Sequence, residues 1–269
     1  MGELDLDRIV TPARTGDGRF AIEVPDGWQQ GRGAFGGLVV AMLVRAIEAT
    51  VGDAARPLRA LNAEIVGPTV PGRAELAVEI LRAGTGVTTA SARLLQQGAV
   101  QAHATAALGK ARTTHASPLA IPPPQMPPWR DVPVSPVVPP VAPVFTQHME
   151  FRVTAGAPLS SRQPGGEEVA GWVRLHHPGR ARDAALIAAL IDSYWPALLV
   201  SATTMRSIAT LAFALQTVAP LDGLDREAPL FYRARNLAGA DGYAIETREL
   251  WGEDGRLVAI NQQTIVVMA

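Results

Sequence analysis

The sequence contains no cysteine and carries almost no net charge. In 269 residues there is no Cys, and the formal net charge is −1. The absence of cysteine excludes disulfides, a thiolate nucleophile and cysteine-ligated zinc. The balanced charge argues against a nucleic-acid partner, because phosphate binding needs clustered Lys and Arg. Hydrophobic residues make up 48% of the chain, so it can bury a sizeable core.

The sequence also lacks an apolar run long enough to cross a bilayer. The longest apolar segment, Leu38–Val51, is interrupted by Arg45 and Glu48, whereas a span needs about 20 residues. Residues 1–8 carry acids where a secretory leader would have an apolar run. No His pair or acid cluster has the spacing of metal ligands. We therefore expect a cytoplasmic protein that does not bind membranes and uses no metal or other cofactor.

The chain repeats one arrangement twice. Residues 31–109 and 180–267 each contain an apolar helical segment followed by four strand-like stretches. Helical spacing of apolar residues predicts helices over Gly36–Val51 and Ala181–Tyr194. Short turns between the strands predict antiparallel sheets, and each sheet buries its helix best by curling around it. The predicted strands are Phe20–Val24, Leu58–Val66, Glu75–Leu81, Val87–Leu95, Val100–Leu108, Gln147–Thr154, Val169–His176, Ile208–Val218, Leu230–Leu237, Tyr243–Trp251 and Leu257–Val267.

The segment between the repeats is rich in proline. Residues 110–145 hold eleven of the 22 prolines, and proline lacks the N–H that a sheet ladder needs. This composition predicts an extended linker with polyproline II character. The expected organisation is therefore an N-terminal domain over residues 1–109, a linker over 110–145 and a C-terminal domain over 146–269.

The two repeats differ at the few positions where chemistry could sit. The first helix starts with Gly36-Gly37, and the second starts with Asp183-Ala184. Alignment of the halves then places three polar residues of the second half opposite non-matching residues of the first. The three pairs are Asp192 with Arg45, Thr210 with Leu58 and Gln263 with Ala106. A duplicated fold with polar groups in one copy suggests a single working site.

Several motifs occur in a characteristic order along the chain. They are Ala34-Phe35-Gly36-Gly37-Leu38-Val39-Val40-Ala41, Leu61-Asn62-Ala63-Glu64-Ile65-Val66-Gly67-Pro68, Leu190-Ile191-Asp192, Ala209-Thr210-Leu211, and Asp254-Gly255-Arg256-Leu257-Val258-Ala259 followed by Gln263. Together they resemble the acyl-CoA thioesterase II family. The resemblance implies an α+β fold of the double-hotdog type, in which two long helices are each wrapped by an antiparallel sheet. It also implies hydrolysis of acyl-CoA by an activated water, and its catalytic set falls on Asp192, Thr210 and Gln263.

The chemistry of these residues suits that reaction. Addition of water to a thioester needs a base for the water and donors for the developing oxyanion. Asp192 lies in an apolar helix, where burial would suit it to act as the base. Thr210 and Gln263 can both donate and accept, so they could hold the water. The N–H of Gly37, at a helix N-terminus, could polarise the carbonyl, and Gly36, Phe35 and Gln30 are further candidates for substrate binding.

Some positions depart from the family pattern and leave alternatives open. Leu38 stands where relatives usually have Gln, Asn62 where they often have His, and Ala212 where many have an acid. A protein that binds acyl-CoA or another acyl group without hydrolysis is therefore the main alternative. A hydratase with this fold would need a paired Asp and His, and no such pair is found. The expected partner is acyl-CoA or a related thioester, and self-association through the sheets is possible.

Overall fold

The computed structural model describes residues 5–112, 121–161, 167–179, 182–225 and 227–268. The acidic start of the chain (residues 1–4), residues 113–120 of the predicted linker and the predicted helix start at Ala181 lie outside this part.

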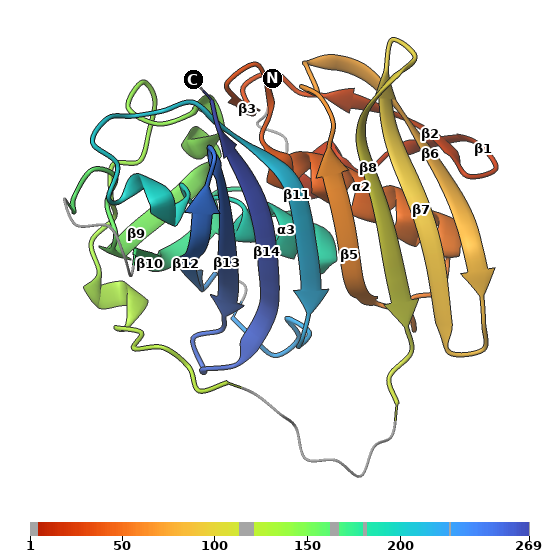
Figure 1. The fold of residues 1–269 in the computed structure, drawn as a ribbon. Helices are drawn as coiled ribbons and strands as arrows, with labels where there is room; N and C mark the ends of the chain where they lie inside the picture. Colours follow the sequence, from red (N-terminus) through yellow and green to blue (C-terminus); the bar gives the residue numbers. More distant parts are fainter. Residues whose placement is uncertain (1–4, 113–120, 162–166, 180–181, 226, 269) are drawn as a thin grey trace.

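A large curved antiparallel sheet dominates the molecule (Figure 1). It has 12 strands in the order β1-β2-β6-β7-β8-β5-β11-β14-β13-β12-β10-β9. Its strands are β1 (Ala13–Gly16), β2 (Arg19–Val24), β5 (Leu58–Ile65), β6 (Gly72–Ala83), β7 (Val87–Gln96), β8 (Ala99–Gly109), β9 (Met149–Ala155), β10 (Glu168–Leu175), β11 (Ile208–Thr217), β12 (Leu230–Ala240), β13 (Tyr243–Trp251) and β14 (Leu257–Val267). The prediction of antiparallel strands is confirmed, with each predicted strand within a few residues of an observed one.

The two repeats meet in the middle of this sheet. Strands β5 and β11 pair directly, from Ala60 opposite Gln216 to Glu64 opposite Ala212. On either side of this seam the strand order is the same in mirror image, because β8, β7 and β6 flank β5 as β14, β13 and β12 flank β11. One ladder of hydrogen bonds therefore runs through both halves of the chain.

Two helices lie side by side on the concave face of the sheet (Figure 1). Helix α2 (Gly36–Val51) has the predicted bounds and ends at Gly52, whose φ of 61° is left-handed and favours glycine. Helix α3 (Ala184–Ile191) is shorter than predicted. Asp183 caps its first turn, and Asp192 leaves helical geometry with φ −102° and ψ 3°. All eight residues of α3 are buried, which explains its uniformly apolar sequence.

Several short elements connect these helices and the large sheet. Helix α1 (Leu6–Val10) packs against α2, and the hairpin of β3 (Gln29–Gln30) with β4 (Gly33–Ala34) leads into α2. The 3₁₀ turns η2 (Val144–His148) and η3 (Ala197–Leu199) precede β9 and follow α3. The proline-rich segment contains a further turn, η1 (Trp129–Asp131).

The proline-rich segment packs against the convex face of the second half. Val132 joins a buried cluster with Trp172, Phe231 and Trp251, which lie on the side of the sheet away from the helices. The indole N–H of Trp172 donates to the carbonyl of Pro127 at 2.9 Å. The described part of this segment is therefore anchored rather than freely extended.

Candidate active site

Asp192 lies at the end of α3, where its side chain reaches the start of α2. The residue is 7% exposed. Its Oδ2 accepts a hydrogen bond from the N–H of Gly37 at 2.6 Å, and its Oδ1 accepts from Gln263 Nε2 and Arg248 Nη1, both at 2.7 Å. Helix α2 has no side-chain cap of its own. Asp192 therefore supplies the anion that the N-terminus of α2 favours.

Gln263 links Asp192 to Thr210. Gln263 is 1% exposed and lies on the inner face of β14. Its Nε2 donates to Asp192, and its Oε1 accepts from the hydroxyl of Thr210 at 2.8 Å. The structure thus brings the three predicted catalytic residues into one hydrogen-bonded chain from three different elements. Thr210 is half-buried, so this chain runs from the core toward the surface.

A β-bulge in β11 directs Thr210 to the inner face. Phe213 pairs with Gln263, and Thr210 pairs with Ile265, so the two residues Thr210 and Leu211 occupy the space of one. In a regular strand with no bulge, Thr210, three residues before the buried Phe213, would face outward. The bulge therefore sets the position of the hydroxyl, and Leu211 is exposed instead.

The site contains a buried cation that the sequence analysis missed. Arg248 of β13 is 2% exposed in its side chain and forms ion pairs of 2.7 Å with both Asp192 and Glu246. Burial opposes its charge, but Tyr232, Glu246 and Asp192 raise the pKa of Arg248 above its ordinary value. Asp192 is therefore buried as expected, but its carboxylate is surrounded by hydrogen-bond donors. A signal was present in the sequence. Glu246, Arg248 and Leu250 alternate along one strand, so the two charged residues share the face of an apolar residue.

The predicted substrate-binding residues surround the start of α2. The N–H of Gly37 already donates to Asp192, so in this structure it is not free for a substrate carbonyl. The N–H of half-buried Gly36 donates to no group within the described residues. Phe35 is buried and stacks on Phe145, with ring centroids 4.3 Å apart. Gln30 lies half-buried in the β3–β4 hairpin.

The equivalent position in the other half holds an ion pair. Arg45 of α2, the counterpart of Asp192, contacts the carboxylate of Asp183 at the start of α3. It also contacts Asp7 of α1 at 2.6 Å. Asp183 caps its own helix by accepting from the N–H of Ala185 at 3.0 Å. Helices α2 and α3 thus make two polar contacts, or helix crossings: Asp192 with Gly37, and Arg45 with Asp183. Of these two crossings, the one at Asp192 places a carboxylate next to Gln263 and Thr210.

Another polar cluster lies on the convex face of the first half. His103 is 3.0 Å from the hydroxyl of Ser91 through Nε2 and 3.1 Å from Glu64 through Nδ1. These groups sit on paired strands whose backbone N–H groups belong to the sheet ladder. A backbone oxyanion hole of the kind found in serine hydrolases therefore cannot form there without breaking the sheet.

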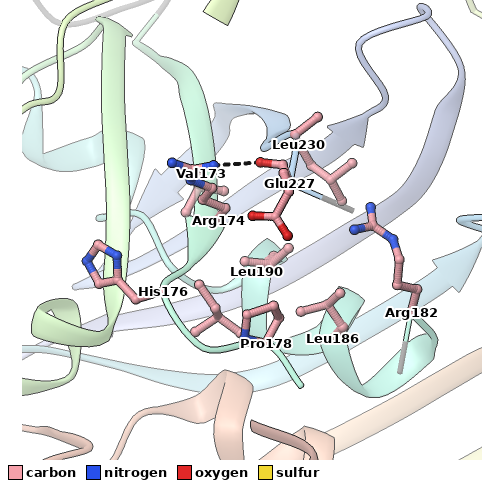
Figure 2. Close-up of a pocket in the computed structure, with 11 residues that line it drawn as sticks. Val173, Arg174, His176, Pro178, Arg182, Leu186, Leu190, Glu227 and Leu230 are labelled. Atoms are coloured by element: carbon pink, nitrogen blue, oxygen red, sulfur yellow. Dashed lines mark hydrogen bonds between the residues drawn. The ribbon is translucent and has the colours of Figure 1, made fainter. Parts of the chain in front are cut away.

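A cavity of about 190 Å³ lies beside α3 (Figure 2). It is lined by Leu186 and Leu190 of the helix and by charged residues that include Arg174 and Glu227. Arg174 donates to the backbone carbonyl of Glu227 at 2.6 Å. None of the three predicted catalytic residues lines this cavity.

The described residues also bear on metal binding and membranes. They contain no group of three or more His, Asp or Glu placed to hold a metal ion. Within the same part of the chain, no helix combines the length and the apolar character that a membrane crossing requires.

Comparison with protein families assigns both halves. Residues 24–109 match the model of the acyl-CoA thioesterase N-terminal domain, and residues 118–267 match that of the C-terminal domain. The chain belongs to this acyl-CoA thioesterase family. Its helix-crossing site with Asp192 is thus the candidate active site of a thioesterase-family protein. No curated protein matches the chain in a sequence search.

Solved structures share the architecture of this thioesterase-family chain over nearly its whole length. A hotdog-fold protein of unknown function from Alicyclobacillus acidocaldarius is 24% identical with a TM-score of 0.87, and the match covers 98% of both chains. A protein from Thermobifida fusca assigned as a thioesterase II is 24% identical with a TM-score of 0.84, covering 98% of this chain and 97% of the other. Acyl-CoA thioesterase II from Mycobacterium marinum is 18% identical with a TM-score of 0.76, covering 98% of both chains. The likeness establishes the hotdog fold.

Proposed function

We propose that this protein hydrolyses acyl thioesters, with acyl-CoA as the substrate class. The observation that supports this most directly is the hydrogen-bonded chain from Thr210 through Gln263 to Asp192. It ends at a carboxylate that touches the N-terminus of α2. Membership of an acyl-CoA thioesterase family supplies the substrate class.

In the proposed mechanism, Oδ2 of Asp192 takes the proton from water. Oδ1 already accepts two hydrogen bonds, whereas Oδ2 accepts one, from Gly37. A carboxylate oxygen has two lone-pair positions, so Oδ2 keeps one for a water molecule. Thr210, which donates to Gln263, can accept the second hydrogen of that water.

The water oxygen then adds to the carbonyl carbon of the thioester. The unengaged N–H of Gly36 is the donor best placed for the oxyanion, because it lies at a helix N-terminus beside Asp192. Collapse of the tetrahedral intermediate breaks the C–S bond, and the thiolate takes the proton held by Asp192. The products are a carboxylic acid and a free thiol, and no cofactor enters the scheme.

The departures from the family pattern differ in their position relative to this site. Leu38 is fully buried in α2. Asn62 is exposed between buried Leu61 and Ala63, so its side chain faces the convex side of the sheet. The departure at Asn62 therefore gives no reason to expect an inactive relative.

We further propose a double-hotdog organisation for the chain. The first hotdog comprises residues 1–109, the second comprises residues 146–269, and the proline-rich residues 110–145 join them. The mirrored strand order about the β5–β11 seam supports this division.

The substitution Asp192→Asn tests the function. Thiol release from a panel of acyl-CoA substrates of different chain length is measured with a thiol reagent, to which this cysteine-free chain gives no background. We expect turnover by the wild type and a fall in kcat of about 10²- to 10⁴-fold in the variant, as for loss of a general base. Asp183→Asn is the matched control, because Asp183 stands at the other helix crossing, and it should retain wild-type kcat.

The outcomes separate the proposal from its main alternative. Equal turnover by wild type and Asp192→Asn removes Asp192 from the mechanism. Tight acyl-CoA binding by a wild type that releases no thiol identifies an acyl-binding protein instead. Calorimetric titration with a non-hydrolysable acyl-CoA thioether distinguishes that case from absence of binding.

A further inference from the structure

The comparison of the two halves singles out more residues once the strand register is known. On the inner face of the first half, Ala90 pairs with Ala106 and Ala92 pairs with Ala104. At the corresponding positions of the second half, Glu246 pairs with Gln263 and Arg248 pairs with Asn261. All eight residues are buried. Where one half has four alanines, the other therefore buries two charged residues and two amides.

Burial of charged groups costs free energy unless they form ion pairs and hydrogen bonds with one another. Moving ionised side chains out of water costs several kcal/mol each, and replacement by apolar residues is often neutral or stabilising. The first half shows that alanine fills these positions in the same fold. The polar set therefore has a use beyond holding the sheet together.

Arg248 is the centre of that polar set. Its Nη1 donates to Asp192 Oδ1 and to the carbonyl of Ile191, and its Nε donates to Glu246 Oε1. The other oxygen of Glu246 accepts from the N–H of Ala197, in the turn that follows α3. Arg248 thus holds the side chain of Asp192, the end of α3 and, through Glu246, the next turn.

We propose that Arg248 is a positioning residue for the active site, anchored by Glu246. It occupies Oδ1 of Asp192 together with Gln263, so that only Oδ2 is left to take a proton. It also fixes the carboxylate against Gly37 and beside Gly36. This inference rests on the proposed function for its catalytic consequence, but the geometry that it describes can be tested separately.

The kinetic test compares Arg248→Met and Arg248→Lys with matched changes at Arg45. Arg45 forms the corresponding ion pair at the other helix crossing, so Arg45→Met controls for the loss of an interhelical ion pair. We expect Arg248→Met to lower kcat about 100-fold with KM changed less than about threefold, because a misplaced catalytic group costs about that much. Arg248→Lys should have a higher kcat than Arg248→Met, because lysine keeps the positive charge but lacks the planar guanidinium that donates to two acceptors at once. Arg45→Met should retain kcat.

A spectroscopic test follows the N–H of Gly37 without using turnover. A short hydrogen bond to a carboxylate moves an amide proton signal downfield, so the ¹H–¹⁵N resonance of Gly37 reports the position of Asp192. We expect this resonance to move upfield in Arg248→Met and in Asp192→Asn, and to stay unchanged in Arg45→Met. Arg248→Lys and Glu246→Gln provide folded samples if the methionine variant does not fold.

The two tests fail in different ways. A wild type without turnover overturns the proposed function, while the Gly37 resonance still decides the role of Arg248. An unchanged Gly37 resonance in the Arg248 variants overturns the positioning role whatever the turnover is. Equal losses of kcat in Arg248→Met and Arg45→Met would show that the ion pair acts only through general stability.

Discussion

Two adjacent glycines at the start of α2 have different surroundings. A Cβ added to Gly37 would lie 2.8 Å from the backbone carbonyl of Ala188 in α3 and 2.6 Å from the ring of Phe35. A Cβ added to Gly36 would meet Oδ2 of Asp192 at 2.8 Å and no other atom closer than 3.8 Å. Gly37 thus allows the two helices to approach, and Gly36 leaves space at the reactive oxygen.

The substitutions Gly37→Ala and Gly36→Ala should therefore separate stability from activity. Gly37→Ala forces the helices apart and should lower the free energy of unfolding by about 1–3 kcal/mol, as for overpacking of a core. Gly36→Ala should cost less stability but lower kcat, because its methyl group takes the place of the water at Asp192. Urea denaturation and thiol release measure the two effects. A Gly36→Ala variant with full turnover would contradict this view of the site.

At the scale of the element, α2 carries a half-buried acid, Glu48, away from the active site. Partial burial raises the pKa of Glu48 from its ordinary 4.5 to about 7, the charge of Asp183 raises it further, and Arg45 lowers it. Between these pH values the folded protein binds more protons than the unfolded chain. The contribution of Glu48 to the free energy of unfolding therefore falls as the pH rises from about 4.5 to 7, and is constant above that range.

The substitution Glu48→Gln should remove this pH dependence. The free energy of unfolding of the wild type should fall more steeply between about pH 5 and pH 7.5 than that of the variant. Chemical denaturation of both proteins at the two pH values measures the difference. Parallel pH profiles would show that Glu48 titrates alike in the folded and unfolded states.

The elements were predictable where local chemistry decides them. The bounds of α2 follow from its apolar spacing and from Gly52, and most strand ends follow from the turns. The early end of α3 was not predictable, because Asp192 leaves the helix to reach a partner on another element. The bulge beside Thr210 also has no local signal, since it depends on the register with β14.

The candidate site was partly predictable for a related reason. Comparison of the halves identified Asp192, Thr210 and Gln263, because each stands opposite a residue of different chemistry. Arg248 and Glu246 were missed because the turn from Trp251 to Leu257 is one residue longer than the turn from Leu95 to Val100, which shifts the alignment of β13. Their alanine counterparts therefore appear only in the strand pairing. A one-residue shift in register moves every side chain of a strand to its opposite face.

At the scale of the whole molecule, several contacts join the two halves. The β5–β11 ladder is continuous, and the N–H of Leu6 donates to the carbonyl of His177 at 3.0 Å. The ring of His148 stacks on Trp28, with centroids 4.1 Å apart. Each half therefore completes the packing of the other.

We accordingly expect both halves to unfold in one transition. Leu61 of β5, in the first half, is fully buried. The substitution Leu61→Ala leaves a cavity there and should lower the free energy of unfolding by about 2–5 kcal/mol. Four of the five tryptophans lie beyond residue 110, so their fluorescence reports mainly on the second half. Its midpoint should fall with that of far-UV circular dichroism. Two separate midpoints, or a fluorescence midpoint unaffected by the substitution, would contradict a single cooperative unit.

The seam between β5 and β11 also determines which sheet edges remain. Because the two inner edges pair with each other, β1 and β9 are the two end strands of the large sheet in the described part of the chain. Strand β1 has four residues, all exposed, and includes Arg14. Strand β9 is bridged by the proline-rich segment through Ser135 opposite Phe151. A short charged edge and a covered edge are poor templates for strand addition, so the fold resists edge-to-edge aggregation.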